Sequence, residues 1–340
     1  MRALIVGLGS AGRRHARNWA ALGGDVWVCR QANTPQPEPL GVEVREFQGL
    51  EQALAAQPDA VIVTNPTSMH VETACAALRA GAHVLVEKPI GDSLNGVDEL
   101  LENARGKVLM VGYNLRFVPT LLRMRELLAT QVIGRPLSAR AEVGEYLPDW
   151  HPWEDYRSSY SARTALGGGP VLTFSHEIDS LCWLLGAPHA VTAVARNASS
   201  LEIDTEDVAE IILEIPSGAL ASVHVDYVRR PARRSIEIVG EDGVLRWEYE
   251  ANRVMRYAAG SQEWIVEEGN PRAKRNDSFL SELRDLQARV NGEPSGVGAT
   301  GEQGAAVLAI ALAALDSSAE GRRIDLSREP EPMQQWLKTL

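Results

Sequence analysis

The chain has 340 residues, of which 45% are hydrophobic and 23% charged, and its formal net charge is −11. This composition is typical of a globular protein with room for two domains. The acidic balance argues against non-specific nucleic-acid binding, and no apolar run reaches the roughly 18 residues of a membrane span. The three cysteines lack metal-ligand spacing and no leader precedes the first predicted strand, so we expect a cytoplasmic protein without a metal.

Strands and helices alternate in the first third of the chain. Strands are predicted at 3–6, 26–29, 42–47, 60–64, 83–86 and 108–111, and helices at 11–22, 50–56, 68–80 and 94–104. Strands separated by helices of this length are joined by right-handed crossovers into a parallel sheet. Residues 1–118 are therefore predicted to form an α/β domain with a parallel sheet covered on both faces.

The pattern changes after residue 118. We predict helices at 120–129 and 171–185, a strand at 137–147, strands at 190–196, 207–215, 219–228, 234–239, 243–248, 252–257 and 262–267, and closing helices at 277–291 and 300–318. Consecutive strands without intervening helices indicate a mostly antiparallel sheet. Residues 119–340 are predicted to form an α+β domain for substrate binding and oligomerisation. One face of its large open sheet is expected to meet a second copy of the chain, in a homodimer or homotetramer.

The first predicted strand runs directly into a glycine-rich turn, and a helix follows. Gly7 permits a tight exit from the strand, Gly9 lets the backbone approach a pyrophosphate, and Gly12 lets the helix pack closely. The helix N-terminus adds free N–H groups and a positive dipole end. We therefore predict that residues 1–118 are a dinucleotide-binding Rossmann domain; the alternative is an ordinary turn. Its predicted contacts in this turn are Gly7, Gly9, Ser10, Ala11, Gly12 and Arg13.

The end of the second strand indicates the choice of cofactor. An acid there binds the ribose of NAD, whereas an arginine accepts the 2′-phosphate of NADP. Arg30 occupies this place and the next acid is Glu38, so NADP is preferred over NAD; the alternative is a solvated arginine with NAD held by backbone contacts. At the end of the fourth strand, Thr64, Asn65 and Pro66 are expected to bind the cofactor, or else only to form a turn.

Glu87, Lys88 and Pro89 follow the fifth strand, and the first two are also expected near the cofactor. Two opposite charges directly after a buried strand are unusual, and ligands bind at the carboxyl edge of such a sheet. A lysine held there by a rigid proline can stabilise negative charge on a substrate oxygen during hydride transfer. The alternative is a polar loop without a chemical role.

Several motifs now follow one another in order along the chain. They are Gly7–Gly12, Thr64–Pro66, Glu87–Pro89, Gly112–Phe117, Gly167–Gly169, Ser175–Asp179 and Trp183–Gly186. Together they resemble the glucose-fructose oxidoreductase / inositol dehydrogenase (Gfo/Idh/MocA) family over nearly the whole chain. The resemblance implies NAD(P)-dependent oxidation or reduction at one carbon of a sugar, cyclitol or similar polyol. It also implies that Lys88 is the active-site lysine and His176 the histidine that often acts as general acid/base.

His176 lies early in a predicted helix, beside Glu177 and Asp179. A histidine suits proton transfer to or from a hydroxyl; the alternative is a helix-end histidine bonded to backbone. Many members of the resembling family carry an aspartate three or four residues earlier, where this chain has Thr173 and Leu172. Three outcomes stay open. Glu177 or Asp179 takes the role of the missing carboxylate, with Asp179 as the catalytic candidate. Otherwise His176 works with Lys88 alone, or catalysis is weak.

The segment Tyr146–Arg163 is both aromatic and polar, and it resembles members of surface-polysaccharide and nucleotide-sugar pathways. Aromatic faces suit sugar C–H groups, and arginine or histidine donors suit hydroxyls or phosphate; the alternative is a structural loop. Substrate contacts are predicted for Asn114, Arg116, Trp150, His151, Arg157, Tyr160, Arg163, Thr173 and His176. A basic cluster further on consists of Arg229, Arg230, Arg233 and Arg234. It is predicted to be a solvated face of a strand and turn; the alternative is a contact with phosphate or with another subunit.

These observations predict an enzyme that passes hydride between nicotinamide and a carbon of a sugar, nucleotide sugar or cyclitol. Lys88 is predicted to polarise the reacting oxygen and His176 to move its proton. The alternatives are a regulator that senses NADP(H) without turnover and a reductase of a non-sugar ring compound. The polar loop 146–163 argues against the last.

Overall fold

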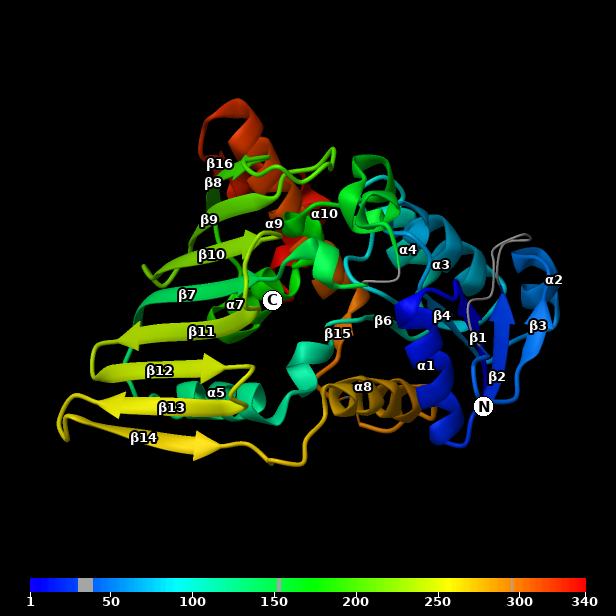
Figure 1. Cartoon of the computed structure of the whole chain (residues 1–340), viewed down its shortest axis with the longest axis horizontal. Helices are drawn as coiled ribbons and strands as arrows, with labels where there is room; N and C mark the ends of the chain where they lie inside the picture. The colour runs from blue at the N-terminus through cyan, green and yellow to red at the C-terminus, as the bar shows by residue number, and fades with distance from the viewer. Residues whose placement is uncertain (30–38, 152–153, 295) are drawn as a thin grey trace. The chain divides into compact units, whose positions relative to one another are not determined.

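The computed structural model describes residues 1–29, 39–151, 154–294 and 296–340. The chain forms two compact units (Figure 1). The first unit contains Met1–Phe117 and Arg275–Ala305, and the second contains Val118–Lys274 and Ala306–Leu340. Each unit has its own sheet and its own core.

The first unit is built on a seven-stranded sheet with the order β15-β6-β5-β4-β1-β2-β3. The strands are β1 (Arg2–Val6), β2 (Asp25–Cys29), β3 (Arg45–Phe47), β4 (Ala60–Val63), β5 (His83–Val86), β6 (Leu109–Val111) and β15 (Ala299–Thr300). β1 to β6 pair in parallel, and β15 pairs antiparallel with β6. The helices are α1 (Ser10–Ala21), α2 (Leu50–Ala55), α3 (His70–Arg79), α4 (Val97–Asn103) and α8 (Arg275–Val290). The predicted parallel α/β sheet is confirmed.

The parallel strands of this sheet end in register along one edge. Their last residues, which pair from strand to strand, are Val6, Cys29, Val63, Val86 and Val111. The next amide still donates to the neighbouring strand at 2.8–3.0 Å at Gly7, Thr64, Glu87 and Gly112. The strand order reverses between β1 and β4, and ligands of open α/β sheets bind at such a reversal. The predicted cofactor segments therefore begin side by side at the expected edge.

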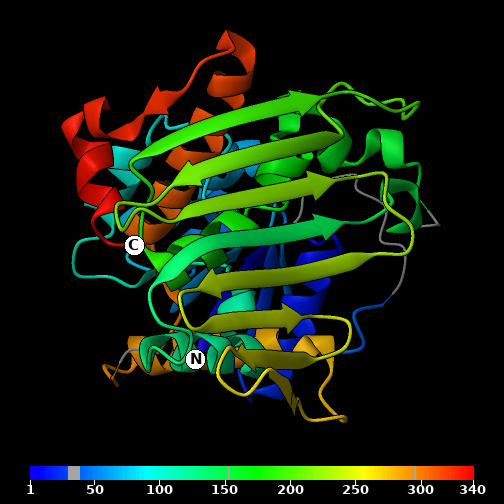
Figure 2. The same ribbon diagram turned by 90° about the vertical axis from the view of Figure 1, so that its left-hand side faces the viewer.

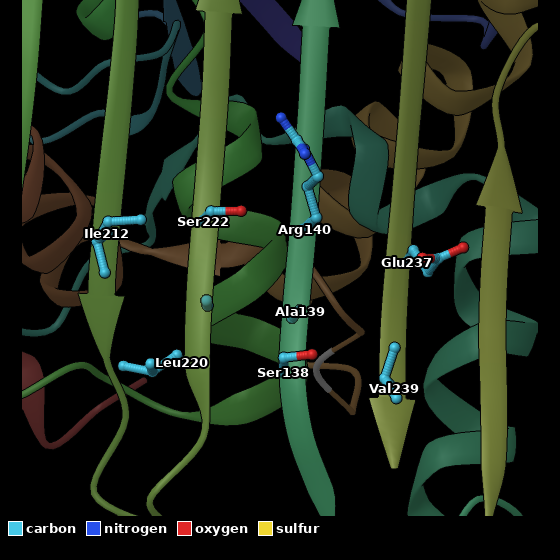
Figure 3. Close-up of a pocket in the computed structure, with 9 residues that line it drawn as sticks. Ser138, Ala139, Arg140, Ile212, Leu220, Ser222, Glu237 and Val239 are labelled. Atoms are coloured by element: carbon cyan, nitrogen blue, oxygen red, sulfur yellow. The ribbon is translucent and has the colours of Figure 1, made fainter.

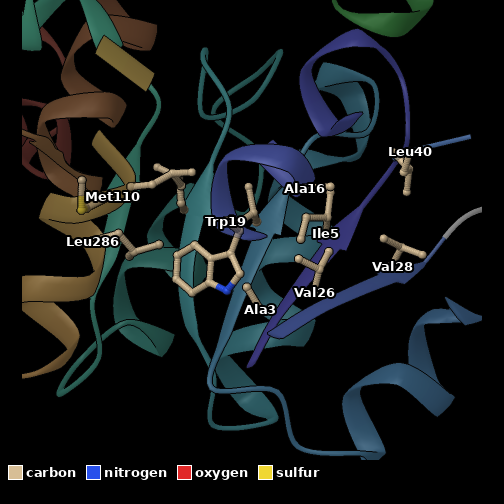
Figure 4. Close-up of a cluster of buried hydrophobic side chains, with 12 residues drawn as sticks. Ala3, Ile5, Ala16, Trp19, Val26, Val28, Leu40, Met110 and Leu286 are labelled. Carbon is tan, nitrogen blue, oxygen red and sulfur yellow. The ribbon is translucent and has the colours of Figure 1, made fainter. Parts of the chain in front are cut away.

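The core of the first unit includes apolar side chains of β1, β2, α1 and α8 (Figure 4). Ile5 and Trp19 are fully buried, and Leu283 and Leu286 of α8 belong to the same cluster. Burial of the apolar side of α8 explains why residues 275–305 belong to the first unit. The sequence prediction assigned all of residues 119–340 to the second domain. It differs from the structure at residues 275–305, which belong to the first unit.

The second unit is built on a nine-stranded sheet with the order β14-β13-β12-β11-β7-β10-β9-β8-β16. The strands are β7 (Pro136–Gly144), β8 (Ala190–Arg196), β9 (Val208–Glu214), β10 (Leu220–Asp226), β11 (Arg233–Gly240), β12 (Gly243–Glu248), β13 (Arg253–Ala258), β14 (Glu263–Glu268) and β16 (Ile324–Asp325). β7 and β10 pair in parallel, and the other neighbours pair antiparallel. The predicted mostly antiparallel sheet is confirmed.

Helices cover one face of this sheet, and the other face is open (Figure 2). The helices are α5 (Pro119–Ala129), α6 (Pro170–Thr173), α7 (His176–Leu185), α9 (Gly301–Glu320), whose first turn belongs to the first unit, and α10 (Glu331–Leu337). Trp247 of β12 donates to Thr120 of α5 at 2.9 Å, and Ala193 of β8 donates to Ser317 of α9 at 2.9 Å. The helix predicted over 171–185 is divided at residues 174–175, and α10 was not predicted.

Two absences hold for the described residues. No helix in these ranges is long and apolar enough to cross a membrane. The same ranges contain no group of three histidine, cysteine or acidic side chains suited to a metal.

Candidate active site

The glycine turn between β1 and α1 has the geometry that the sequence predicts. Gly7 has a φ of +94°, and a β carbon on it would lie 2.8 Å from the amide nitrogen of Asn65. A β carbon on Gly12 would lie 2.0 Å from the carbonyl oxygen of Gly7. Both positions therefore require glycine, because the turn packs tightly against the residues that follow β4.

Gly9 is different, because the described protein does not itself require glycine there. Its φ of −67° is open to any residue, and a β carbon on it meets no described atom within 4 Å. α1 also begins with no side-chain cap and no acid in its first turn. A pyrophosphate that approaches the backbone at Gly9 and accepts the first N–H groups of α1 fits both observations.

Thr64 and Asn65 have different surroundings. Thr64 Oγ1 donates to the carbonyl of Gly7 at 2.7 Å, so this hydroxyl stabilises the glycine turn. Asn65 Nδ2 donates to Thr73 Oγ1 at 2.8 Å, whereas Asn65 Oδ1 is buried without a partner among the described residues. Since a buried acceptor without a donor costs free energy, Asn65 Oδ1 fits a donor from the cofactor.

Lys88 lies between two residues that are held by buried histidines. Before it, Glu87 Oε1 accepts a hydrogen bond from His15 Nε2 at 2.9 Å, and Glu87 Oε2 lies 3.2 Å from the Lys88 amide nitrogen. After it, a cis peptide bond leads to Pro89, whose carbonyl oxygen lies 2.8 Å from His70 Nδ1. The backbone on both sides of the lysine is therefore fixed from α1 and α3.

Two acids near this segment differ in their electrostatics. Burial raises the pKa of Glu87, but the hydrogen bond and charge of His15, together with the charge of Lys88, outweigh it and lower the pKa below its ordinary value. Glu282 of α8 is 1% exposed, and neither of its carboxyl oxygens has a described partner. Burial, with the charges of Glu87 and Asp285, raises the pKa of Glu282 well above its ordinary value. Glu87 is thus held ionised, and Glu282 favours the neutral form.

Two other predicted residues of the first unit are buried in contacts with its own elements. Asn114 Nδ2 donates to Ser278 of α8 at 2.8 Å. Arg116 is 1% exposed and donates to Gln303 at 2.7 Å. They attach the segment after β6 to α8 and α9, and their predicted substrate contacts stay a prediction.

Of the two arginines predicted to bind the cofactor, the structure describes only one. Arg13 Nη2 donates to the carbonyl of Pro39 at 3.2 Å, which ties α1 to the chain that leads into β3. Arg30 lies outside the described residues. Neither observation tests a contact with a phosphate.

In the second unit, His176 is the first residue of α7 and is 7% exposed. The glycine run before it makes the local turn possible: Gly169 has a φ of +97°, and a β carbon on it would lie 2.4 Å from Glu206 Oε1. The short helix α6 follows at Pro170, and two residues separate its end from the start of α7. The predicted motif therefore has a structural basis in the glycine-dependent turn.

Thr173, at one of the two positions where many family members have an aspartate, forms a hydrogen bond between neutral hydroxyl groups. Thr173 Oγ1 accepts from the hydroxyl of Tyr227 at 2.7 Å, and both side chains are buried. Burial raises the pKa of Tyr227 well above its ordinary value, so the phenol stays protonated. Of the two acids that could replace the carboxylate, Glu177 is paired with Arg234 at 2.7 Å, whereas Asp179 is fully buried in α7.

The prediction that Arg234 lies on a solvated face is wrong. Arg234 is 8% exposed and its Nε donates to Glu177 Oε1. A single sequence shows four arginines around a turn but not which one points inward, because that depends on the acid of α7 beneath β11. Arg230 keeps the expected exposure and pairs with Asp149.

Aromatic rings from three segments meet in the second unit. The ring centroids of Trp150, Phe174 and Tyr227 lie 5.4–5.6 Å apart in edge-to-face pairs. Trp150 Nε1 is buried without a hydrogen-bond partner in the described ranges. His151 is partly buried and Tyr160 is 40% exposed. This aromatic cluster lies beside the start of α7, because Phe174 is two residues before His176.

The predicted substrate arginines of this loop already contact acids. Arg157 pairs with Asp155 at 2.9 Å and with Glu202 at 2.5 Å. Arg163 lies 3.7 Å from Asp204. All of these side chains are about half exposed, so the pairs are weak. A substrate phosphate could displace them, and their substrate role stays a prediction.

Sequence reasoning missed three buried titratable residues of the first unit: His15, His70 and Glu282. His15 lies one helical turn after the glycine turn, and His70 begins the helix after the Asn65 turn. All three lie on the buried face of a helix, at helical spacing from small or apolar residues, and this spacing is the signal that could have identified them.

Comparison with known proteins gives matches in both units. A family model described as an oxidoreductase family with an NAD-binding Rossmann fold matches residues 1–115. A second model, described as the GFO/IDH/MocA C-terminal domain, matches residues 121–246.

Individual proteins are similar over nearly the whole length. A 1,5-anhydro-D-fructose reductase of Ensifer adhaerens is 30% identical over 330 residues, which cover 92% of this chain and 95% of the relative. A myo-inositol 2-dehydrogenase of Thermotoga maritima is 28% identical and covers 96% of this chain and 98% of its own. The crystal structure of GenD2 from gentamicin A biosynthesis in complex with NAD has a TM-score of 0.80 at 26% identity and covers 96% of each chain.

Proposed function

Because this chain belongs to the Gfo/Idh/MocA family of NAD-binding oxidoreductases, we propose that it transfers hydride between a nicotinamide dinucleotide and a carbon of a sugar derivative. One observation carries the proposal. The glycine turn, Asn65 and Lys88 follow three neighbouring strands that end in register. A backbone suited to phosphate, an acceptor without a partner among the described residues and a cation therefore begin at one edge of the first sheet.

The residues that would hold the dinucleotide belong to the first unit. The N–H groups of Ser10 and Ala11 at the start of α1 bind the pyrophosphate, with Gly9 leaving room for it. Asn65 Oδ1 accepts a hydrogen bond from the cofactor. When bound, the nicotinamide ring accepts or supplies the hydride. The tight packing of Gly7 and Gly12 keeps these groups in place before binding, which reduces the entropy cost of binding.

Lys88 acts on the oxygen of the reacting carbon. During oxidation the carbon loses hydride and the hydroxyl loses its proton, so negative charge grows on the oxygen in the transition state. The ammonium group of Lys88 stabilises that charge. The contacts of Glu87 and Pro89 hold the lysine backbone beforehand, as an efficient electrostatic catalyst requires.

His176 moves the proton of the reacting hydroxyl. The imidazole accepts this proton during oxidation and returns it during reduction. Its support is the resemblance of Ser175–Asp179 to the family motif and its place at the start of a buried helix. Asp179 is the candidate for orienting it, since Glu177 is held by Arg234.

A sugar or nucleotide sugar is the proposed substrate class. The aromatic cluster of the second unit provides apolar ring edges, and Trp150 Nε1 provides a buried donor without a partner among the described residues. Such a combination suits a ring that carries both C–H groups and hydroxyls. The two relatives reported above are named for a sugar and a cyclitol.

The preferred cofactor is proposed to be NADP, with NAD as the alternative. The preference rests on the sequence alone, in which Arg30 directly follows the strand and the next acid is Glu38. Fluorescence titration of NADPH and NADH against the purified protein tests it directly. Clearly tighter binding of NADH would contradict the preference without affecting the rest of the proposal.

The function itself is tested by a substrate screen. Sugars, cyclitols and nucleotide sugars are supplied with oxidised NADP or NAD, and formation of the reduced cofactor is followed by absorbance; corresponding ketones are supplied with the reduced forms. Turnover that disappears in His176→Ala, with cofactor binding retained, supports an enzyme. Tight cofactor binding without turnover of any compound would instead support the cofactor-sensing regulator, which the Thr173–Tyr227 bond in place of an acid favours as the second candidate.

The open face of the second sheet is proposed to bind a second copy of this chain. It carries the exposed apolar side chains Val194, Ile212 and Leu220, and a shallow hollow there is lined by polar and apolar residues (Figure 3). Exposed apolar side chains on an uncovered sheet face support an interface with a second copy. Sedimentation measurements on the wild type and Ile212→Glu test the homodimer or homotetramer; the cytoplasmic location also remains a prediction.

A further inference from the structure

His70 connects two segments that leave neighbouring strands of the first sheet. It is the first residue of α3 and is 2% exposed. Its Nδ1 lies 2.8 Å from the carbonyl oxygen of Pro89, and its Nε2 lies 2.9 Å from the carbonyl oxygen of Asn65. One imidazole therefore contacts the segment after β4 through one nitrogen and the segment after β5 through the other.

The two carbonyls belong to residues with separate proposed tasks. Asn65 carries the buried Oδ1 that lacks a partner among the described residues and is proposed to face the cofactor. Pro89 directly follows Lys88, whose other neighbour, Glu87, is held by His15. A shift of the Asn65 backbone on cofactor binding would therefore be transmitted by the imidazole to the backbone of the lysine.

The two ring nitrogens of His70 have different acceptors. Burial lowers the pKa of His70, although the two carbonyls and Glu87 act in the opposite direction. A carbonyl oxygen only accepts, so each contact depends on an N–H at the ring nitrogen that faces it. Nδ1–H would serve the carbonyl of Pro89 and Nε2–H that of Asn65, so the two contacts can be removed separately.

We propose that His70 is a positioning residue that couples the cofactor segment at Asn65 to the segment that carries Lys88. The proposal rests on the proposed function for the tasks of Asn65 and Lys88. It assigns His70 no contact with substrate or cofactor. If the proposal holds, removing the contact of one ring nitrogen affects cofactor binding, and removing the contact of the other affects the position of Lys88.

Two substitutions separate the contacts, because the amide of asparagine mimics Nδ1–H and that of glutamine mimics Nε2–H. His70→Asn retains a donor for Pro89, so we expect kcat to stay near the wild-type value while the Kd of the reduced cofactor rises about five- to tenfold. His70→Gln retains a donor for Asn65, so we expect the Kd to stay while kcat falls by about the same factor. Parallel changes of kcat and Kd in both variants, or no change in either, would show a merely structural histidine.

The matched control is His83 at the start of β5. Its Nδ1 accepts a hydrogen bond from the amide of Val108 at 2.9 Å. This contact lies at the amino end of β5, away from the carboxyl ends of the strands that carry Asn65 and Lys88. His83→Gln is expected to alter the melting temperature without separating kcat from Kd. A separation of the same kind in this control would overturn the assignment to His70.

Amide hydrogen exchange gives a readout that needs no turnover. Addition of reduced cofactor is expected to slow amide exchange at Glu87, Lys88 and Ile90 in the wild type and to slow it less in His70→Gln. The difference between the two proteins, rather than the slowing itself, reports the coupling. Unchanged exchange in the wild type at saturating cofactor, or equal slowing in both proteins, would contradict the coupling. Absence of turnover with this difference present would instead contradict the proposed function and leave the coupling supported.

Discussion

The proposed cofactor side in the first unit and the proposed substrate side in the second are constructed differently. On the cofactor side, strand register and tight glycine packing place the functional groups, and buried side chains such as His15 and His70 hold them. On the proposed substrate side, short 3₁₀ turns at 147–149, 156–158, 160–162 and 164–166 carry exposed side chains, and Arg157 and Arg163 pair with acids on a neighbouring loop. A binding site formed by packed backbone has its geometry before the ligand binds. A binding site formed by exposed side chains depends on whether the ligand can replace the acids with which those side chains already pair.

The largest expected effect is at Lys88. Lys88→Ala is expected to lower kcat by roughly 10²–10³-fold, because it removes the charge that stabilises the reacting oxygen, while the folded backbone and cofactor binding remain. Steady-state rates and fluorescence titration of the cofactor measure the two effects separately. Lys107→Ala, which removes a lysine that contacts the carbonyl of Gly81 at 2.6 Å, is the control. Unchanged turnover in Lys88→Ala would remove the lysine from the mechanism.

The next prediction separates packing from binding within the glycine turn. Gly12→Ala is expected to lower the free energy of unfolding by about 2–4 kcal/mol, because its β carbon meets the Gly7 carbonyl and the backbone must move. Gly9→Ala is expected to cost no more than about 1 kcal/mol of stability and to weaken cofactor binding at least about tenfold. Urea unfolding and cofactor titration test both. Equal cofactor affinity of Gly9→Ala and wild type would argue against a pyrophosphate at this position.

The buried carboxyl group of Glu282 is expected to make the stability of the protein depend on pH. Its pKa is raised in the folded protein, so above the ordinary glutamate range the folded state binds a proton that the unfolded state has lost. Stability therefore falls as pH rises, by about 1.4 kcal/mol per pH unit until the folded-state pKa is passed. Glu282→Gln is expected to flatten this fall over the range from about pH 5 upward. Melting curves across this range, with exposed Glu43→Gln as the control, measure it; identical profiles for Glu282→Gln and wild type would contradict a buried carboxyl without a partner.

The smallest expected effect is on the substrate side. Trp150→Phe keeps the ring that packs on Phe174 and Tyr227 but removes the buried Nε1–H. We expect KM for the sugar to rise about two- to tenfold, with kcat and melting temperature little changed. Trp264→Phe, at a 43% exposed position on β14, should change neither constant. A large loss of stability with an unchanged KM would show that Trp150 is only part of the core.

Much of the cofactor side could be predicted because its signals are local. Gly7, Gly12 and the residues after each strand follow from strand-turn-helix patterns that extend over a few residues. His15, His70 and Arg234 could not be assigned, because their roles depend on partners at Glu87, Pro89 and Glu177 that lie far away in sequence. Similarly, α8 was predicted as a helix, but its place in the core of the first unit depends on Leu283 and Leu286 meeting the cluster around Trp19.

The sequence by itself determined the parallel and antiparallel sheets, the glycine turn and the positions of Lys88 and His176, because hydrophobic period and turn chemistry are properties of short segments. Only the tertiary structure decided which polar residues are buried and what they contact. It aligned the ends of β1, β4 and β5, and it left Asn65 Oδ1 without a described partner. It also placed one imidazole between two of these segments. Burial and partner choice are decided when distant segments pack, and no single segment encodes them.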